Sequence, residues 1–113
     1  MLAASFVLEG QEFMALNGGA PFHFSIGMSI VIKCETQDEI DKLWEGLSDG
    51  GEKVQCGWLT DKYGVSWQIV PRILPELLND PDPKKRAAVM KAMLRMTKLD
   101  IAKLQAARDH AGD

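Results

Sequence analysis

The chain of 113 residues lacks the features that mark membrane and nucleic-acid-binding proteins. No apolar run approaches the roughly 18–20 residues that a membrane-spanning helix needs, so we expect no membrane partner. The net charge is −3, and the lysines and arginines do not gather into a block. Because nucleic acids are held largely through basic patches that meet their phosphates, we also expect no nucleic-acid partner.

Cysteine and histidine are scarce. Only Cys34 and Cys56 could pair, and no basic segment precedes Glu9 as a secretion signal would require. We therefore predict a cytoplasmic protein in which both cysteines are free, half-buried thiols. The two histidines, His23 and His110, do not stand in an order typical of a catalytic triad. We interpret His23 as a packing or rim residue.

The residues that are present predict one α+β domain, 1–113, with three parts. Two short apolar runs flank the polar turn Glu9-Gly10-Gln11-Glu12 and predict a hairpin over 5–17. Turn-forming residues at 17–21 then break the pattern.

Residues 28–71 predict a βαβββ module. Met28 to Cys34 is rich in β-branched residues and predicts a well-buried strand. Thr36 and Glu39 form a capping box at the start of a helix that Gly50-Gly51 ends. Three strands are then expected, at Lys53–Cys56, Trp58–Asp61 and Val65–Val70, with a turn over Asp61-Lys62-Tyr63-Gly64.

Residues 72–110 predict a helical tail, with a short helix beginning as early as Pro71 and ending near Leu78. Asp82 can cap a second helix with Pro83 at its first position. Thr97 can cap a last helix. The expected apolar side of the second helix is rich in methionine, which indicates an adaptable core or a dimer surface. Its members are Val89, Met90, Met93, Leu94 and Met96.

These segments together resemble one protein family. The specific blocks are Phe13 to Gly19, Cys34 to Asp41, and Cys56-Gly57-Trp58-Leu59 continuing to Trp67-Gln68-Ile69-Val70-Pro71. They are similar to the PhnB-like, 3-demethylubiquinone-9 3-methyltransferase-like branch of the vicinal oxygen chelate superfamily, which includes glyoxalases, bleomycin resistance proteins and dioxygenases. The resemblance implies a glyoxalase/bleomycin resistance-like mixed sheet, built in the family from two βαβββ modules around a shared cleft.

The same resemblance implies that the first strand, helix and second strand of the family's first module, which would precede Ser5, are missing. An open sheet edge leaves backbone groups unpaired. We therefore expect a second copy of the chain to complete the structure as a homodimer, with strand exchange as one option.

By the resemblance, metal ligands of the superfamily would fall near Phe13, near Ser29 and at Gln68. Phenylalanine cannot ligate, and neutral serine and glutamine are poor substitutes for histidine and glutamate. We therefore expect no metal. We also expect no S-adenosylmethionine or other cofactor, because neither Gly18-Gly19 nor Gly50-Gly51 lies between a parallel strand and a helix.

The leading hypothesis is a domain that sequesters or senses a small, partly aromatic or apolar molecule. Apolar walls with a few polar groups are typical of such a site. The expected ligand-binding residues are Asn17, Phe22, Phe24, Trp58 and Gln68. Two alternatives stay open. One is an enzyme that uses Glu12, His23 or Cys56 for side-chain catalysis, and the other is a structural fragment without a working cleft.

Overall fold

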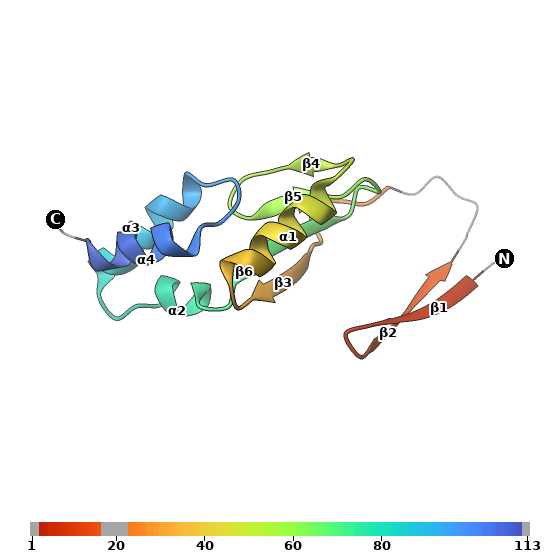
Figure 1. Ribbon diagram of the computed structural model, residues 1–113, viewed down its shortest axis with the longest axis horizontal. Coiled ribbons are helices and arrows are strands. Elements are labelled where there is room, and N and C mark those ends of the chain that lie inside the picture. The colour runs from red at the N-terminus through yellow and green to blue at the C-terminus, as the bar shows by residue number, and fades with distance from the viewer. Residues whose placement is uncertain (1–2, 17–22, 112–113) are drawn as a thin grey trace.

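Figure 1 shows the computed structural model, in which residues 3–16 and 23–111 are described. A hairpin is followed by a mixed sheet with one helix, and then by three more helices, as the α+β prediction requires. The elements are β1 Ala3–Leu8, β2 Gln11–Leu16, β3 Ile30–Cys34, α1 Gln37–Ser48, β4 Glu52–Lys53, β5 Trp58–Thr60, β6 Ser66–Pro71, α2 Leu74–Leu78, α3 Pro83–Leu94 and α4 Ile101–Asp109.

The predicted hairpin is present, but its turn is shorter than expected. Glu9 and Gly10 alone connect the strands, with φ angles of 51° and 78°. A two-residue turn with both φ angles positive matches the right-handed twist of the flanking strands. Phe6 lies opposite Phe13 in the register, and their rings stack with centroids 5.6 Å apart. Every residue of both strands is exposed.

The second sheet has the order β3-β6-β5-β4, with β3 parallel to β6 and the other pairs antiparallel. The expectation of a well-buried first strand was wrong. Strand β3 lies at the sheet edge, so Ile30 and Val31 are 42% and 48% exposed. The strand expected at Lys53–Cys56 is also shorter: β4 ends at Lys53, and the chain then turns at Cys56, whose φ is 60°.

Helix α1 covers one face of this sheet. The Thr36 side chain accepts a hydrogen bond from the Glu39 N–H, as predicted. The return bond differs, since the Glu39 carboxylate accepts from the N–H of Glu35 instead of that of Thr36. Ile40 and Trp44 are buried, in one core with Cys34, Leu59 and Ile69.

The helical tail forms a second core with the end of β6. Asp82 caps α3, as predicted. Asp100, and not Thr97, caps α4, because the Thr97 carbonyl accepts from the Gly57 N–H and keeps that segment on the sheet. Of the predicted apolar side of α3, Val89 is buried and Met93 packs on the core. Met90 and Leu94, each one position further round the helix, are 42% and 56% exposed.

The molecule is elongated. Its extents are 59 × 27 × 23 Å, and its radius of gyration is 16.9 Å, against about 13 Å for a compact domain of this length. The hairpin lies at one end and the helical tail at the other (Figure 1). Within the described part of the chain, no helix is long and apolar enough to cross a membrane.

Candidate functional site

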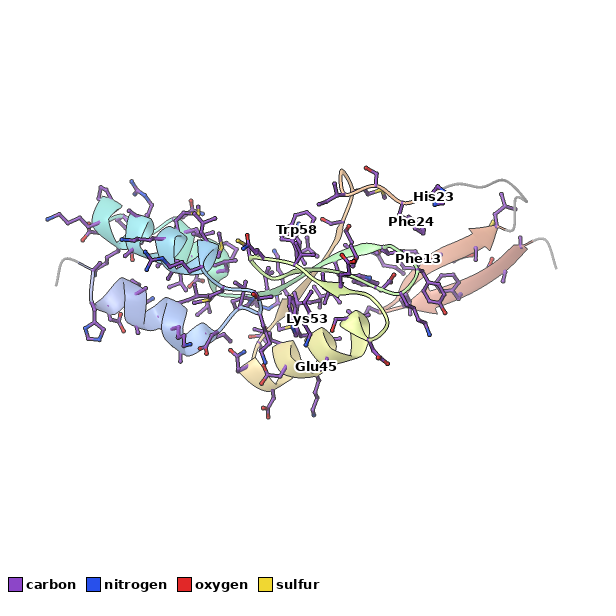
Figure 2. All side chains as sticks on the ribbon, turned by 90° about the horizontal axis from the view of Figure 1, so that it is seen from above. Phe13, His23, Phe24, Glu45, Lys53 and Trp58 are labelled. Carbon is purple, nitrogen blue, oxygen red and sulfur yellow. The ribbon has the colours of Figure 1, made fainter. Side chains whose placement is uncertain are left out.

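The candidate site lies on the sheet face opposite α1, which we call the open face. Side chains alternate along a strand, and Leu59 and Ile69 point toward α1. Their neighbours Trp58 and Gln68 therefore point the other way, and they are direct partners in the β5–β6 register. Figure 2 shows Trp58 on the side away from Glu45 and Lys53, which pair beside α1.

Gln68 is a polar group with a fixed orientation. Its Nε2 atom donates to the Ser29 hydroxyl over 2.9 Å. Gln68 lies between two register partners, Trp58 on β5 and Val31 on β3. With Nε2 held by Ser29, the Oε1 atom is placed to accept a hydrogen bond from a ligand. Val31, Gln68 and Trp58 thus form a row of one apolar, one polar and one aromatic side chain across three strands.

The other predicted ligand-binding residues do not join this row. Phe24 is 68% exposed, and along the long axis of the molecule it lies toward the hairpin, away from Trp58 (Figure 2). Asn17 and Phe22 lie outside the described residues, as does the predicted turn at 17–21. Of the five predicted ligand-binding residues, the described part of one chain therefore brings only Trp58 and Gln68 together.

The side chains named for the catalytic alternative are also separated. Glu12 lies in the hairpin, whereas the Cys56 N–H, in the β4–β5 connection, bonds to the carbonyl of Met96, which follows α3. His23 lies in the segment between hairpin and sheet. In residues 3–16 and 23–111, no three His, Cys, Asp or Glu side chains lie close enough together to hold a metal ion.

Asp61 organises a second polar centre that the sequence prediction treated only as part of a turn. Its carboxylate accepts from the N–H groups of Tyr63 and Val65 and from the Trp67 indole Nε1 at 2.9 Å. Burial raises the pKa of Asp61, but these hydrogen bonds outweigh it, so the net shift is downward. An aspartate followed three residues later by glycine, in a predicted turn, was the available signal.

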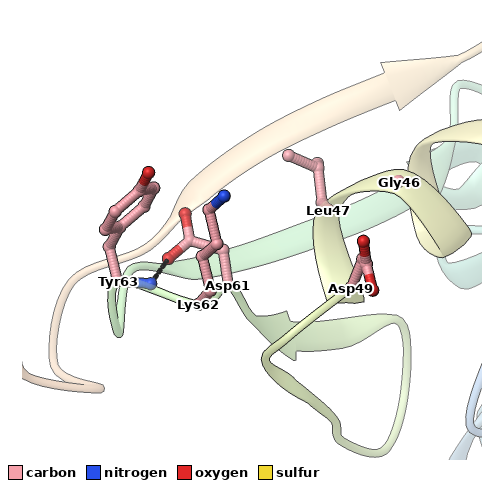
Figure 3. A pocket seen from close by; sticks show the side chains of 6 residues that line it. All are labelled: Gly46, Leu47, Asp49, Asp61, Lys62 and Tyr63. Carbon is pink, nitrogen blue, oxygen red and sulfur yellow. Dashed lines mark hydrogen bonds between the residues drawn. The ribbon is translucent and has the colours of Figure 1, made fainter.

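A hollow of about 160 Å³ adjoins Asp61 (Figure 3). It is lined by Gly46, Leu47, Asp49, Asp61, Lys62 and Tyr63. Ligand pockets usually occupy roughly 300–1,000 Å³. Because the hollow is small and its central carboxylate already accepts three hydrogen bonds, we regard Asp61 as structural.

The two thiols differ. Both cysteines are free, as predicted, but Cys34 is fully buried, whereas Cys56 is half-buried. Burial, with a smaller contribution from the charge of Glu39, raises the pKa of the Cys34 thiol. A buried thiol that stays protonated is a poor nucleophile, so Cys34 acts as a core residue.

Comparisons with known proteins agree on the family. The family model described as 3-demethylubiquinone-9 3-methyltransferase matches residues 1–70. A solved structure titled putative 3-demethylubiquinone-9 3-methyltransferase, PhnB protein, from Bacillus cereus is 38% identical, with a TM-score of 0.58 over 62% of this chain and 64% of that one. Protein PA1353 from Pseudomonas aeruginosa shares the fold at 23% identity, with a TM-score of 0.53 over 63% of this chain and 62% of that one. The chain thus spans less than two thirds of the length of either. A search of curated proteins finds no match.

Proposed function

The chain belongs to the family described as 3-demethylubiquinone-9 3-methyltransferase, with the glyoxalase-like fold, and on that premise we propose that it is a metal-free domain that binds a small molecule. The ligand lies on the open face, against Trp58 and Gln68. A second copy of the chain supplies the rest of the cleft. The adjacency of Trp58 and the oriented Gln68 amide is the observation that carries this proposal.

The side chains of the open face favour a planar, partly aromatic ligand that carries a hydrogen-bond donor. The Trp58 indole offers an apolar surface on which a ring can stack. The Gln68 Oε1 atom can accept one hydrogen bond, which fixes the orientation of the ligand. Small-molecule sites commonly combine broad apolar walls with a few polar groups in this way.

Binding is preferred to methyl transfer, although the family description refers to a methyltransferase. Gly50 and Gly51 follow the C-terminal end of α1, and Gly50 has a φ of 78°. That is the place of a helix-ending glycine. A glycine loop that cradles a nucleotide cofactor instead precedes a helix.

The test is a thermal-shift screen with planar aromatic acids, phenols and quinones, followed by titration of any compound that raises the melting temperature. Trp58→Ala should weaken binding about tenfold or more through lost stacking. Gln68→Leu should weaken it about fivefold through one lost hydrogen bond. Lys53→Ala, on the α1 side of the sheet, is the matched control. Binding that survives both open-face substitutions would place the ligand elsewhere.

A further inference from the structure

The β1–β2 hairpin carries an uncovered aromatic face. Phe6 and Phe13 are 43% and 40% exposed. By the alternation of the strands, Ala4 and Ala15, a direct pair, share their side of the hairpin, and we call this side the aromatic face. An isolated two-stranded hairpin is marginally stable at best in water, because it has no third layer to cover its apolar side chains. Something must therefore cover this hairpin.

The second sheet has a free edge at which such a hairpin could lie. β3 is the edge strand beside β6, so the backbone groups on its outer side have no neighbouring strand in the described sheet. Val31 is 48% exposed on the open face, at this edge. A free, partly apolar edge strand is a template for pairing with another chain.

We propose that the hairpin of one copy docks at the β3 edge of a second copy, and that the exchange is reciprocal. Phe6 and Phe13 of each copy then form the missing wall of the other copy's Trp58–Gln68 site. This inference rests on the proposed function and names the residues that the partner contributes to it. A chain does not cover its own hairpin in this structure, since every residue of β1 and β2 is exposed.

The charges of the hairpin and of β3 agree with this occupant, and the size of the hairpin predicts a weak association. Residues 3–16 of the hairpin contain Glu9 and Glu12 and no lysine or arginine, whereas Lys33 lies exposed on β3, two positions after Val31 and on the same face. Glu12 precedes Phe13 and lies on the opposite side of the hairpin, so its attraction to Lys33 favours the approach of the hairpin but does not set its orientation. A hairpin with two six-residue strands covers about 20 × 10 Å. Two hairpins on two receiving surfaces therefore remove on the order of 800 Å², which is below the roughly 1,200–2,000 Å² of stable specific interfaces and predicts a weak, concentration-dependent dimer.

The test is complementation between two variants, followed by light scattering. Phe13→Asp damages the docking face of the hairpin, and Val31→Asp damages the receiving surface. Each variant alone should be monomeric, because both of its interfaces carry a buried charge. An equimolar mixture should recover dimers, because the Val31→Asp hairpin is intact and can dock on the intact surface of the Phe13→Asp chain.

Met14→Asp is the matched control. Met14 follows Phe13 directly, is 68% exposed and points to the opposite side of the hairpin, so this variant should remain dimeric. Circular dichroism should show that all three variants are folded. If a variant does not fold, the complementation is repeated with Phe13→Ser and Val31→Ser.

Three results would overturn the inference. A monomeric wild-type chain would mean that the hairpin covers its own sheet. A Val31→Asp variant that stays dimeric would mean that the hairpins meet each other or another surface. Failure of the mixture to associate would exclude reciprocal exchange. The ligand titration separates the two proposals. A complementing dimer without ligands refutes the binding function alone. A monomer that binds through Trp58 refutes the exchange and the second copy's part in the cleft, and leaves the binding itself standing.

Discussion

At the residue scale, Asp61 shows how one side chain fixes a turn and a half-buried aromatic ring together. Its carboxylate accepts hydrogen bonds from the N–H groups of the β5–β6 turn and from the Nε1 atom of Trp67. The Trp67 ring packs on the core between α1 and the sheet. The turn geometry is thereby tied to the packing of α1. The Trp67 side of β6 is thus committed to structure, which leaves the Gln68 side for a ligand.

Asp61→Asn should therefore destabilise the protein by about 1–2 kcal/mol, because an amide cannot offer oxygen to both the backbone and the indole. Asp49→Asn, which changes a carboxylate beside the same hollow, is the control and should have little effect. Urea unfolding at pH 7 measures both. Equal stabilities of the two variants would show that the indole bond contributes little.

The lowered pKa of Asp61 also predicts a pH dependence. A carboxyl group with a depressed folded-state pKa contributes stability above its unfolded pKa, near 3.9. That contribution is lost as the pH falls through the lower, folded-state value. The difference in stability between wild type and Asp61→Asn should thus shrink below about pH 4, which acid titration of the unfolding midpoint would show.

At the element scale, Gly57 is where the helical tail meets the sheet. Its N–H donates to the Thr97 carbonyl, and its carbonyl accepts from the Ile69 N–H. A Cβ atom here would lie 2.9 Å from the Ile69 carbonyl oxygen and 3.0 Å from Leu99 Cδ1. Gln37 adds a second attachment, since its amide donates to the Leu99 carbonyl and accepts from the Ile101 N–H.

Gly57→Ala should cost more stability than Gly64→Ala, although both glycines have a φ near 85°. The Cβ atom of Gly64→Ala would meet no atom within 4 Å. Its only cost in folding free energy is that of the left-handed backbone conformation, about 1–2 kcal/mol. Gly57→Ala must also displace Leu99 and should cost at least about 1 kcal/mol more. Urea unfolding of the two variants gives the difference in their unfolding free energies. Equal values would show that Leu99 moves away from the added methyl group at little cost in free energy.

At the scale of the whole molecule, the elongated chain with an uncovered hairpin predicts a stability that depends on protein concentration. Association stabilises the folded state by mass action. The melting temperature should rise measurably between micromolar and hundred-micromolar protein for the wild type. It should stay constant for Phe13→Asp. A constant value for both would indicate a self-sufficient monomer and would agree with the first of the overturning results above.

The sequence by itself determined the order of the elements and the family. Local signals are strong where neighbours along the chain satisfy one another, as where Thr36 caps α1 and Asp82 caps α3. They also decided that Trp67 and Gln68 face opposite sides of β6, because side chains alternate along any strand.

Only the tertiary structure decided what depends on contacts between distant segments. The apolar sequence of β3 predicted burial, but its place at the sheet edge exposes Val31. Thr97 has a capping side chain, but its carbonyl is held by Gly57, so α4 begins after Asp100. Trp58 and Gln68 are ten residues apart and become neighbours only through the β5–β6 register. Pairing partners and edges are set by the whole sheet, and no local pattern of residues contains them.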